Sequence, residues 1–176
     1  EPLEADPDAE YERELVLNVD EMPFFVAKPH QFGNVAPVEE AAGTKVNQAQ
    51  IGSCANGRFE DIEIAARMLR GRKVARGVRF VVSPASQQVY LQCLEAGVVR
   101  TIVEAGGQFV GPGCGICQPM LGFISDGEVC ITATTRNFKG RKGSLNADIY
   151  LAGPLTVTAA AVAGEIVNPK EVFHDL

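Results

Sequence analysis

The feature that most constrains the fold is an alternation, from residue 45 to the C-terminus, between short apolar runs and longer amphipathic runs. Short runs bounded by glycine, proline or serine are typical of buried strands and cover residues 45–51, 78–82, 108–110, 128–132 and 148–151. The longer runs are typical of helices and cover residues 59–69, 86–96, 98–104 and 155–163. Strands that alternate with helices favour parallel pairing, because each helix returns the chain to the same edge of the sheet. We therefore expect an α/β fold over residues 45–176, a three-layer sandwich with a largely parallel sheet.

Residues 1–44 lack this alternation. Residues 1–21 open with a run rich in Glu and Asp, which predicts a solvated acidic arm, and they include a stretch at 14–19 that is typical of a short strand. Prolines interrupt residues 22–44, so this segment is expected to be an irregular connector. The chain does not begin with Met, which suggests that it is a piece of a longer polypeptide.

Composition argues against several classes of protein. The chain of 176 residues is 46% hydrophobic and 22% charged, as expected for one soluble domain, and it shows neither a membrane-length apolar run nor a signal-peptide pattern. Its net charge of −6 argues against a nucleic-acid-binding surface. Five cysteines are an odd number, and Cys93 and Cys130 lie in apolar runs typical of buried side chains. The cysteines therefore argue against a secreted disulfide scaffold and favour the reducing cytoplasm.

The other three cysteines lie in glycine-rich turns, each after an expected strand. Cys54 follows strand 45–51, and Cys114 and Cys117 follow strand 108–110. The carboxyl ends of parallel strands meet at one edge of a sheet, so these turns should converge. Thiolates bind zinc and iron–sulfur clusters. Spacing alone leaves three interpretations open: a cluster held by three thiolates, a zinc site with a fourth ligand, and a protein without metal.

A basic loop follows strand 128–132 and should reach the same edge. It contains Arg136 and Arg141, with Lys139 and Lys142 beside them. A basic loop is often merely solvated, but the planar guanidinium binds carboxylates with a two-pronged geometry that lysine lacks. Two arginines at the edge that carries the cysteines suit a di- or tricarboxylic acid, and the lysines would add attraction without geometry.

Three segments in register resemble the aconitase superfamily. They are Gly-Ser-Cys-Ala-Asn-Gly-Arg at 52–58, Pro-Gly-Cys-Gly-Ile-Cys at 112–117 and Arg-Asn-Phe-Lys-Gly-Arg at 136–141. The amino-acid sequence of these segments is most similar to the branch that contains the large subunits of 3-isopropylmalate dehydratase and homoaconitase. Within these subunits it is most similar to the third domain. The resemblance runs from about residue 15 to the C-terminus.

The resemblance implies a [4Fe-4S] hydro-lyase that isomerises a 2-hydroxy dicarboxylic acid by dehydration and rehydration, as in leucine biosynthesis. The implied cluster ligands are Cys54, Cys114 and Cys117. The implied substrate-binding residues are Arg136 and Arg141, and those adjacent to the cluster are Ser53, Asn56 and Thr135. The chain departs from the superfamily pattern at Ala55, where Thr is usual, and at Thr135, where Asn is usual. These departures bear on cluster tuning and leave the three thiolates intact.

The resemblance also implies missing parts. In the superfamily the catalytic base lies outside this domain, on the remaining large-subunit domains or on a small swivel-domain subunit. The two histidines, His30 and His174, are not convincing acid–base groups, so we expect no catalytic residue in this chain and no turnover by it alone. Isopropylmalate is the first candidate substrate, followed by those of homoaconitase, aconitase and dimethylmalate dehydratase. An RNA-binding role is disfavoured by the acidic charge, and a structural zinc-binding or cluster-free domain is the alternative of a different class.

Overall fold

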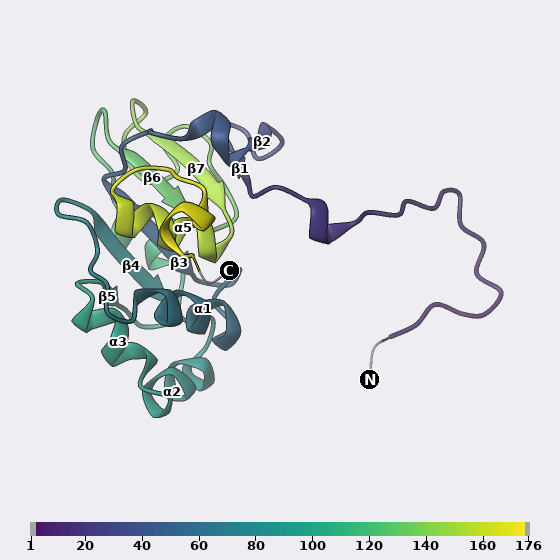
Figure 1. Cartoon of the computed structure of the whole chain (residues 1–176), viewed down its shortest axis with the longest axis horizontal. Helices are drawn as coiled ribbons and strands as arrows, with labels where there is room; N and C mark the ends of the chain where they lie inside the picture. Colours follow the sequence, from purple (N-terminus) through teal and green to yellow (C-terminus); the bar gives the residue numbers. More distant parts are fainter. Residues whose placement is uncertain (1–2, 175–176) are drawn as a thin grey trace.

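A seven-stranded sheet forms the centre of the computed structural model, which describes residues 3–174 (Figure 1). The strand order is β2-β1-β7-β6-β3-β4-β5. The strands are β1 (Phe25–Ala27), β2 (Val35–Pro37), β3 (Gln48–Gly52), β4 (Arg79–Ser83), β5 (Gln108–Phe109), β6 (Val129–Thr132) and β7 (Asp148–Ala152). Pairing is parallel from β7 through β5 and antiparallel only where β1 joins β7 and β2. The predicted α/β class with a largely parallel sheet is confirmed.

Longer helices alternate with the parallel strands. They are α1 (Phe59–Leu69), α2 (Gln87–Glu95), α3 (Val98–Glu104) and α5 (Pro154–Ala163). The single-turn elements are η1 (Val19–Glu21), η2 (Val38–Ala41), η3 (Gly115–Cys117), α4 (Pro119–Gly122) and α6 (Pro169–Val172). Among residues 3–174, no helix combines the length and the apolar character needed to cross a membrane.

Local sequence explains where α1 begins and which face it buries. The backbone N–H of Arg58 donates to the carboxylate of Asp61 at 3.1 Å, which satisfies a donor at the start of the helix. Ile62, Ala66 and Leu69 recur at helical spacing and are buried. Acidic residues in the first turn also suit the helix dipole. The same amphipathic stripe therefore decides both the helix and its contact with the sheet.

The two faces of the sheet are covered differently. Ala49 and Ile51 of β3 and Ile131 of β6 lie in the main core, together with buried residues of α1, α3 and α5. Successive side chains of a strand point to opposite faces, so Gln50 and Thr132 point away from these helices. Both are buried nonetheless, because loops that carry η3 and α4 cover that face. The third layer is thus built mainly of loops and single turns.

The N-terminal arm is exposed, as predicted, but the prediction of a strand at residues 14–19 is wrong. Residues 3–23 are all exposed and contain only a hydrogen-bonded turn at residues 7–8 and the single turn η1. Figure 1 shows this segment extending away from the sheet. A β-strand requires a partner for its backbone hydrogen bonds, and residues 14–19 have none within the described chain. The local apolar pattern alone is therefore not enough to form a strand.

The irregular connector expected at 22–44 needs a larger correction, because this segment adds two strands to the sheet. β1 pairs with β7, with Val26 opposite Ala152, and β2 pairs with β1. Val26 and Val38 are fully buried in the main core. Pro37 ends the edge strand β2, where a missing backbone N–H is tolerated. The folded domain thus begins near Phe25 rather than at residue 45.

Candidate functional site

Three loops leave the same edge of the sheet and touch one another, as the parallel pairing predicts. β3 lies between β6 and β4, and β5 pairs with β4, so the segments after Gly52, Phe109 and Thr132 start side by side. The Cys117 thiol donates to Ser53 Oγ at 3.1 Å. The Asn56 amide nitrogen donates to the Ala133 carbonyl at 2.8 Å. The turn around Cys54 therefore contacts both of the other loops.

The Cys54 turn has an unusual backbone. Ser53 and Asn56 adopt positive φ angles of 69° and 52°, a conformation that costs free energy for residues other than glycine. The Ser53 N–H donates to the Ser83 carbonyl at 2.8 Å, and the Ser53 side chain is buried. Cys54 itself is exposed. The surrounding contacts thus hold a strained turn whose one thiol points outward.

The second cysteine turn is anchored by its buried half. Cys114 is exposed, whereas Cys117 is buried and its N–H donates to the Cys114 carbonyl at 3.0 Å. Ile116 between them is fully buried and packs with Val81 of β4. The turn therefore presents one thiol to solvent and directs the other toward the Cys54 turn.

The donor set fits an iron–sulfur cluster better than a closed zinc site. All five cysteine thiols are free, and three of them lie in the two touching turns. In the described part of the chain, no three His, Cys, Asp or Glu side chains are already close enough to form a metal-binding group. A structural zinc site needs four ligands, for which His30, Cys93 and Cys130 are the candidates. Cys93 is buried in the core on the helical face, and His30 lies beside Asp148, at 3.5 Å. Cys130 is buried in a separate apolar cluster near the start of β6, whereas the cysteine turns follow the strand ends. Three thiols are the set that leaves one iron of a [4Fe-4S] cluster open.

The arginine loop holds its two arginines differently. Arg136 is exposed, and its Nη1 donates to the Thr135 carbonyl at 2.8 Å. The guanidinium carbon of Arg141 lies 5.6 Å from the centroid of the Phe138 ring, which is a cation–π distance. The buried Asn137 side chain donates to the Lys28 carbonyl at 3.0 Å and fixes the loop between them.

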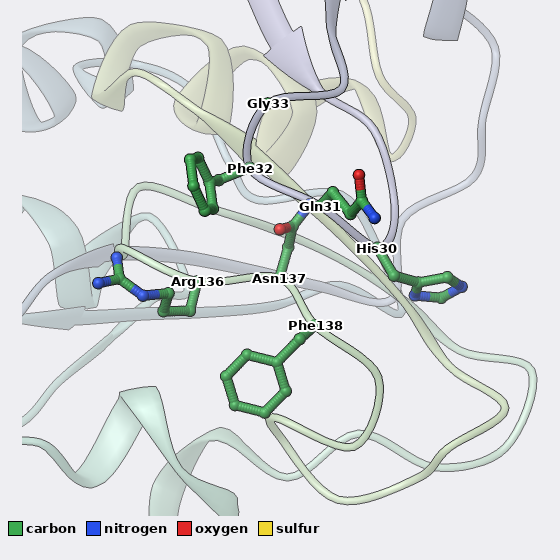
Figure 2. A pocket seen from close by; sticks show the side chains of 7 residues that line it. All are labelled: His30, Gln31, Phe32, Gly33, Arg136, Asn137 and Phe138. Atoms are coloured by element: carbon green, nitrogen blue, oxygen red, sulfur yellow. The ribbon is translucent and has the colours of Figure 1, made fainter.

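A pocket of about 410 Å³ opens beside Arg136 and was not expected from the sequence. Figure 2 shows Arg136 and Phe138 on one side and the turn between β1 and β2 on the other. Its lining residues are His30, Gln31, Phe32, Gly33, Arg136, Asn137 and Phe138. The sequence does not predict that this turn reaches the site, because residues 22–44 are expected to be an irregular connector. Only the pairing of β1 with β7 brings it to the arginine loop.

Lys142 also differs from expectation. The sequence suggested a solvated lysine that would add attraction for an acid, yet Lys142 is fully buried, whereas Lys139 is exposed. Its ammonium donates to Gln50 Oε1, to the Ile116 carbonyl at 3.1 Å and to Thr132 Oγ1 at 3.4 Å. Burial lowers the pKa of Lys142. No local pattern distinguishes it from Lys139, because its burial depends on a loop that crosses the polar face of the sheet.

The cysteines should differ sharply in reactivity. Cys93 and Cys130 are fully buried, as expected, and burial raises the pKa of Cys93 to about 11 and also raises the pKa of Cys130. We expect iodoacetamide to modify Cys54 and Cys114 in the native, cluster-free protein, and to modify Cys93 and Cys130 only after unfolding. Peptide mass spectrometry after timed labelling measures this order. Equal native rates at Cys93 and Cys54 would contradict the described burial.

Comparison with known proteins shows which family this chain is similar to. The model of the aconitase family (aconitate hydratase) matches residues 2–164. The chain is 53% identical over 170 residues to "3-isopropylmalate dehydratase large subunit 2" of Archaeoglobus fulgidus, which covers 96% of this chain and 41% of that protein. It is 50% identical over 161 residues to "3-isopropylmalate dehydratase large subunit 2" of Pyrococcus furiosus, a match that covers 91% of this chain and 42% of that protein. It is 46% identical over 174 residues to "3-isopropylmalate dehydratase large subunit" of Mycolicibacterium smegmatis, a match that covers 98% of this chain and 41% of that protein.

The chain therefore spans about 41% of the length of the curated relatives that it matches. The family match covers most of the chain, including all three glycine-rich or basic segments. The resemblance inferred from the motifs is confirmed: this chain belongs to the aconitase family.

Proposed function

We propose that this chain is the cluster-carrying domain of a 3-isopropylmalate dehydratase large subunit. The observation that carries the proposal is the contact between two turns remote in sequence, in which the Cys117 thiol reaches Ser53 at 3.1 Å. A shared metal centre between these turns requires such an approach. Support also comes from the relatives, whose printed names are those of 3-isopropylmalate dehydratase large subunits.

The residues divide into those that hold a cluster and those that hold a substrate. Cys54, Cys114 and Cys117 would bind a [4Fe-4S] cluster, which supplies a Lewis acid that polarises the substrate hydroxyl. Arg136 and Arg141 would bind the substrate carboxylates, since the guanidinium fork fits a carboxylate in two-pronged fashion. Carboxylate binding orients the carbon that loses a proton and the carbon that loses water.

Three neighbouring residues support the cluster turns. Ser53 accepts the hydrogen bond from Cys117, and Asn56 ties the Cys54 turn to the segment after β6. Thr135 precedes Arg136 and presents its carbonyl to that guanidinium. Positioning of this kind reduces the reorganisation that metal binding requires.

The remaining catalytic parts would come from outside this chain. The name "large subunit" in the relatives implies a small subunit, and the covered share leaves room for further large-subunit domains. We propose that these supply the catalytic base and that this chain alone does not turn over substrate. We also propose the cytoplasm, where five free thiols stay reduced. Leucine biosynthesis is the pathway in which such an enzyme acts.

The decisive experiment uses the complete large subunit together with its small subunit, reconstituted anaerobically with iron and sulfide. We expect isopropylmalate to be dehydrated, as followed by the ultraviolet absorbance of the conjugated double bond. Homocitrate, citrate and dimethylmalate distinguish the alternative hydro-lyase activities. A colourless protein with stoichiometric zinc and no dehydration of any of these acids would overturn the proposal and favour a structural domain.

Arg141→Lys in the same complete enzyme should lower kcat/KM for isopropylmalate about ten- to a hundredfold while the cluster spectrum stays unchanged. Lysine keeps the charge but loses the two-pronged hydrogen bonds and the stacking on Phe138. Arg100→Lys is the matched control, because Arg100 is exposed on α3 and pairs with Glu104. Equal kcat/KM for the wild type and Arg141→Lys would show that Arg141 does not bind substrate.

A further inference from the structure

Lys142 is a buried lysine without a carboxylate partner. Its side chain is fully buried between the sheet and the loop that follows β6. Within residues 3–174, the ion pairs involve other cations, and none joins Lys142 to an Asp or Glu. An ammonium group removed from water is costly unless hydrogen bonds and a negative charge compensate it. This position therefore calls for a nearby negative charge, which no Asp or Glu of residues 3–174 supplies.

The hydrogen bonds of Lys142 provide one acceptor for each N–H of the charged form and connect three segments. An ammonium group has three N–H donors, and here they meet three oxygen acceptors, Gln50 Oε1, Thr132 Oγ1 and the Ile116 carbonyl. Gln50 lies in the middle of β3, Thr132 ends β6, and Ile116 lies between the two cysteines of the second turn. Lys142 thus ties the cysteine turn to two neighbouring central strands, β3 and β6.

The anions available to Lys142 are thiolates. Ionised Cys117 and ionised Cys130 would each raise the pKa of Lys142, against the effect of burial. Burial raises the pKa of Cys130, which favours its neutral thiol. Cys117 is different, since it sits in the touching cysteine turns and is followed by an exposed helical turn. Of the two, Cys117 is the sulfur that a metal centre would hold as a thiolate.

We propose that Lys142 is a positioning residue for the iron–sulfur centre: it holds the Ile116 carbonyl beneath the cysteine turn and places a positive charge behind Cys117 that raises the cluster's reduction potential. The inference rests on the proposed function. A cluster bound by three thiolates carries negative charge, and adding an electron increases it. A fixed cation in a region shielded from water stabilises the reduced form, so its removal makes reduction harder.

The test measures the midpoint potential of the reconstituted cluster in the complete large subunit by redox titration followed by electron paramagnetic resonance. Lys142→Met removes the charge and keeps much of the volume. We expect its potential to shift to more negative values than that of the wild type. Lys139→Met is the matched control, because it removes one positive charge from an exposed position of the same loop. Its potential should equal that of the wild type, since solvent screens that charge.

A second variant keeps the test decisive if Lys142→Met fails to fold. Gln50→Glu retains the lysine and the side-chain volume but places a carboxylate on its ammonium, which offsets the charge. It should shift the potential in the same negative direction. A cluster that binds with unchanged potential in Lys142→Met, or in Gln50→Glu where the first variant does not fold, overturns this inference alone. A wild-type protein that takes up no cluster overturns the proposed function together with it.

Discussion

Cys54→Ser is expected to remove nearly all iron and the visible charge-transfer absorbance after anaerobic reconstitution. Cys54 is the one proposed ligand on the β3 turn, and the two remaining thiols both belong to the turn after β5. Serine offers a harder oxygen donor that is protonated at neutral pH, so it replaces a thiolate poorly. With two thiolates left on one turn, the cluster loses its attachment to the other.

The matched control for this experiment is Cys93→Ala. Cys93 is fully buried in α2 on the helical face of the sheet, so its removal leaves the proposed site untouched. We expect iron content and absorbance equal to those of the wild type, with some loss of thermal stability from the small cavity. Full iron content in Cys54→Ser, alongside a normal control, would show that the β3 turn does not hold the metal.

Gly52→Ala is expected to prevent stable folding, with a loss of more than about 4 kcal/mol in the free energy of unfolding. Gly52 has φ of 108°, which side-chain-bearing residues rarely adopt. A Cβ at this position would lie 1.8 Å from the Ser83 carbonyl oxygen and 2.8 Å from its carbon. Relief requires β3 and β4 to separate where Ser53 donates to that carbonyl, which also dismantles the Cys54 turn.

Urea unfolding or thermal melting followed by circular dichroism measures this effect. Gly153→Ala is the control, because Gly153 has φ of −67° and a Cβ there would meet no atom within 4 Å. It should melt within a few degrees of the wild type. A Gly52→Ala variant that melts alongside this control would mean that β3 and β4 do not approach as described.

Helices and parallel strands followed closely from local pattern. The predicted helices at 59–69 and 98–104 coincide with α1 and α3, and each predicted strand after residue 45 lies within about three residues of an observed one. Such elements depend on side chains near in sequence, which either form one apolar stripe or do not. The common edge for the cysteine turns followed as well, since parallel pairing places all strand ends together.

The predictions that were wrong share a different cause. The stretch at 14–19 has a strand-like composition but finds no partner among residues 3–174, whereas β1 and β2 have prolines nearby and still pair. Strand formation depends on hydrogen bonds to a remote segment, here β7 for β1. The pocket beside Arg136 depends on the same pairing. Composition over a few residues carries little information about which distant strand is available.

The sequence by itself determined the family, the succession of strands and helices along the chain after residue 45, and the three thiols and two arginines of the proposed site. These properties reside in short motifs and in periodicity, which neighbouring residues settle among themselves. Only the tertiary structure decided that Cys117 meets Ser53, that β1 carries its turn to Arg136, and that Lys142 is buried while Lys139 faces water. Each of these depends on segments far apart in the chain, whose approach is set by packing across the whole sheet.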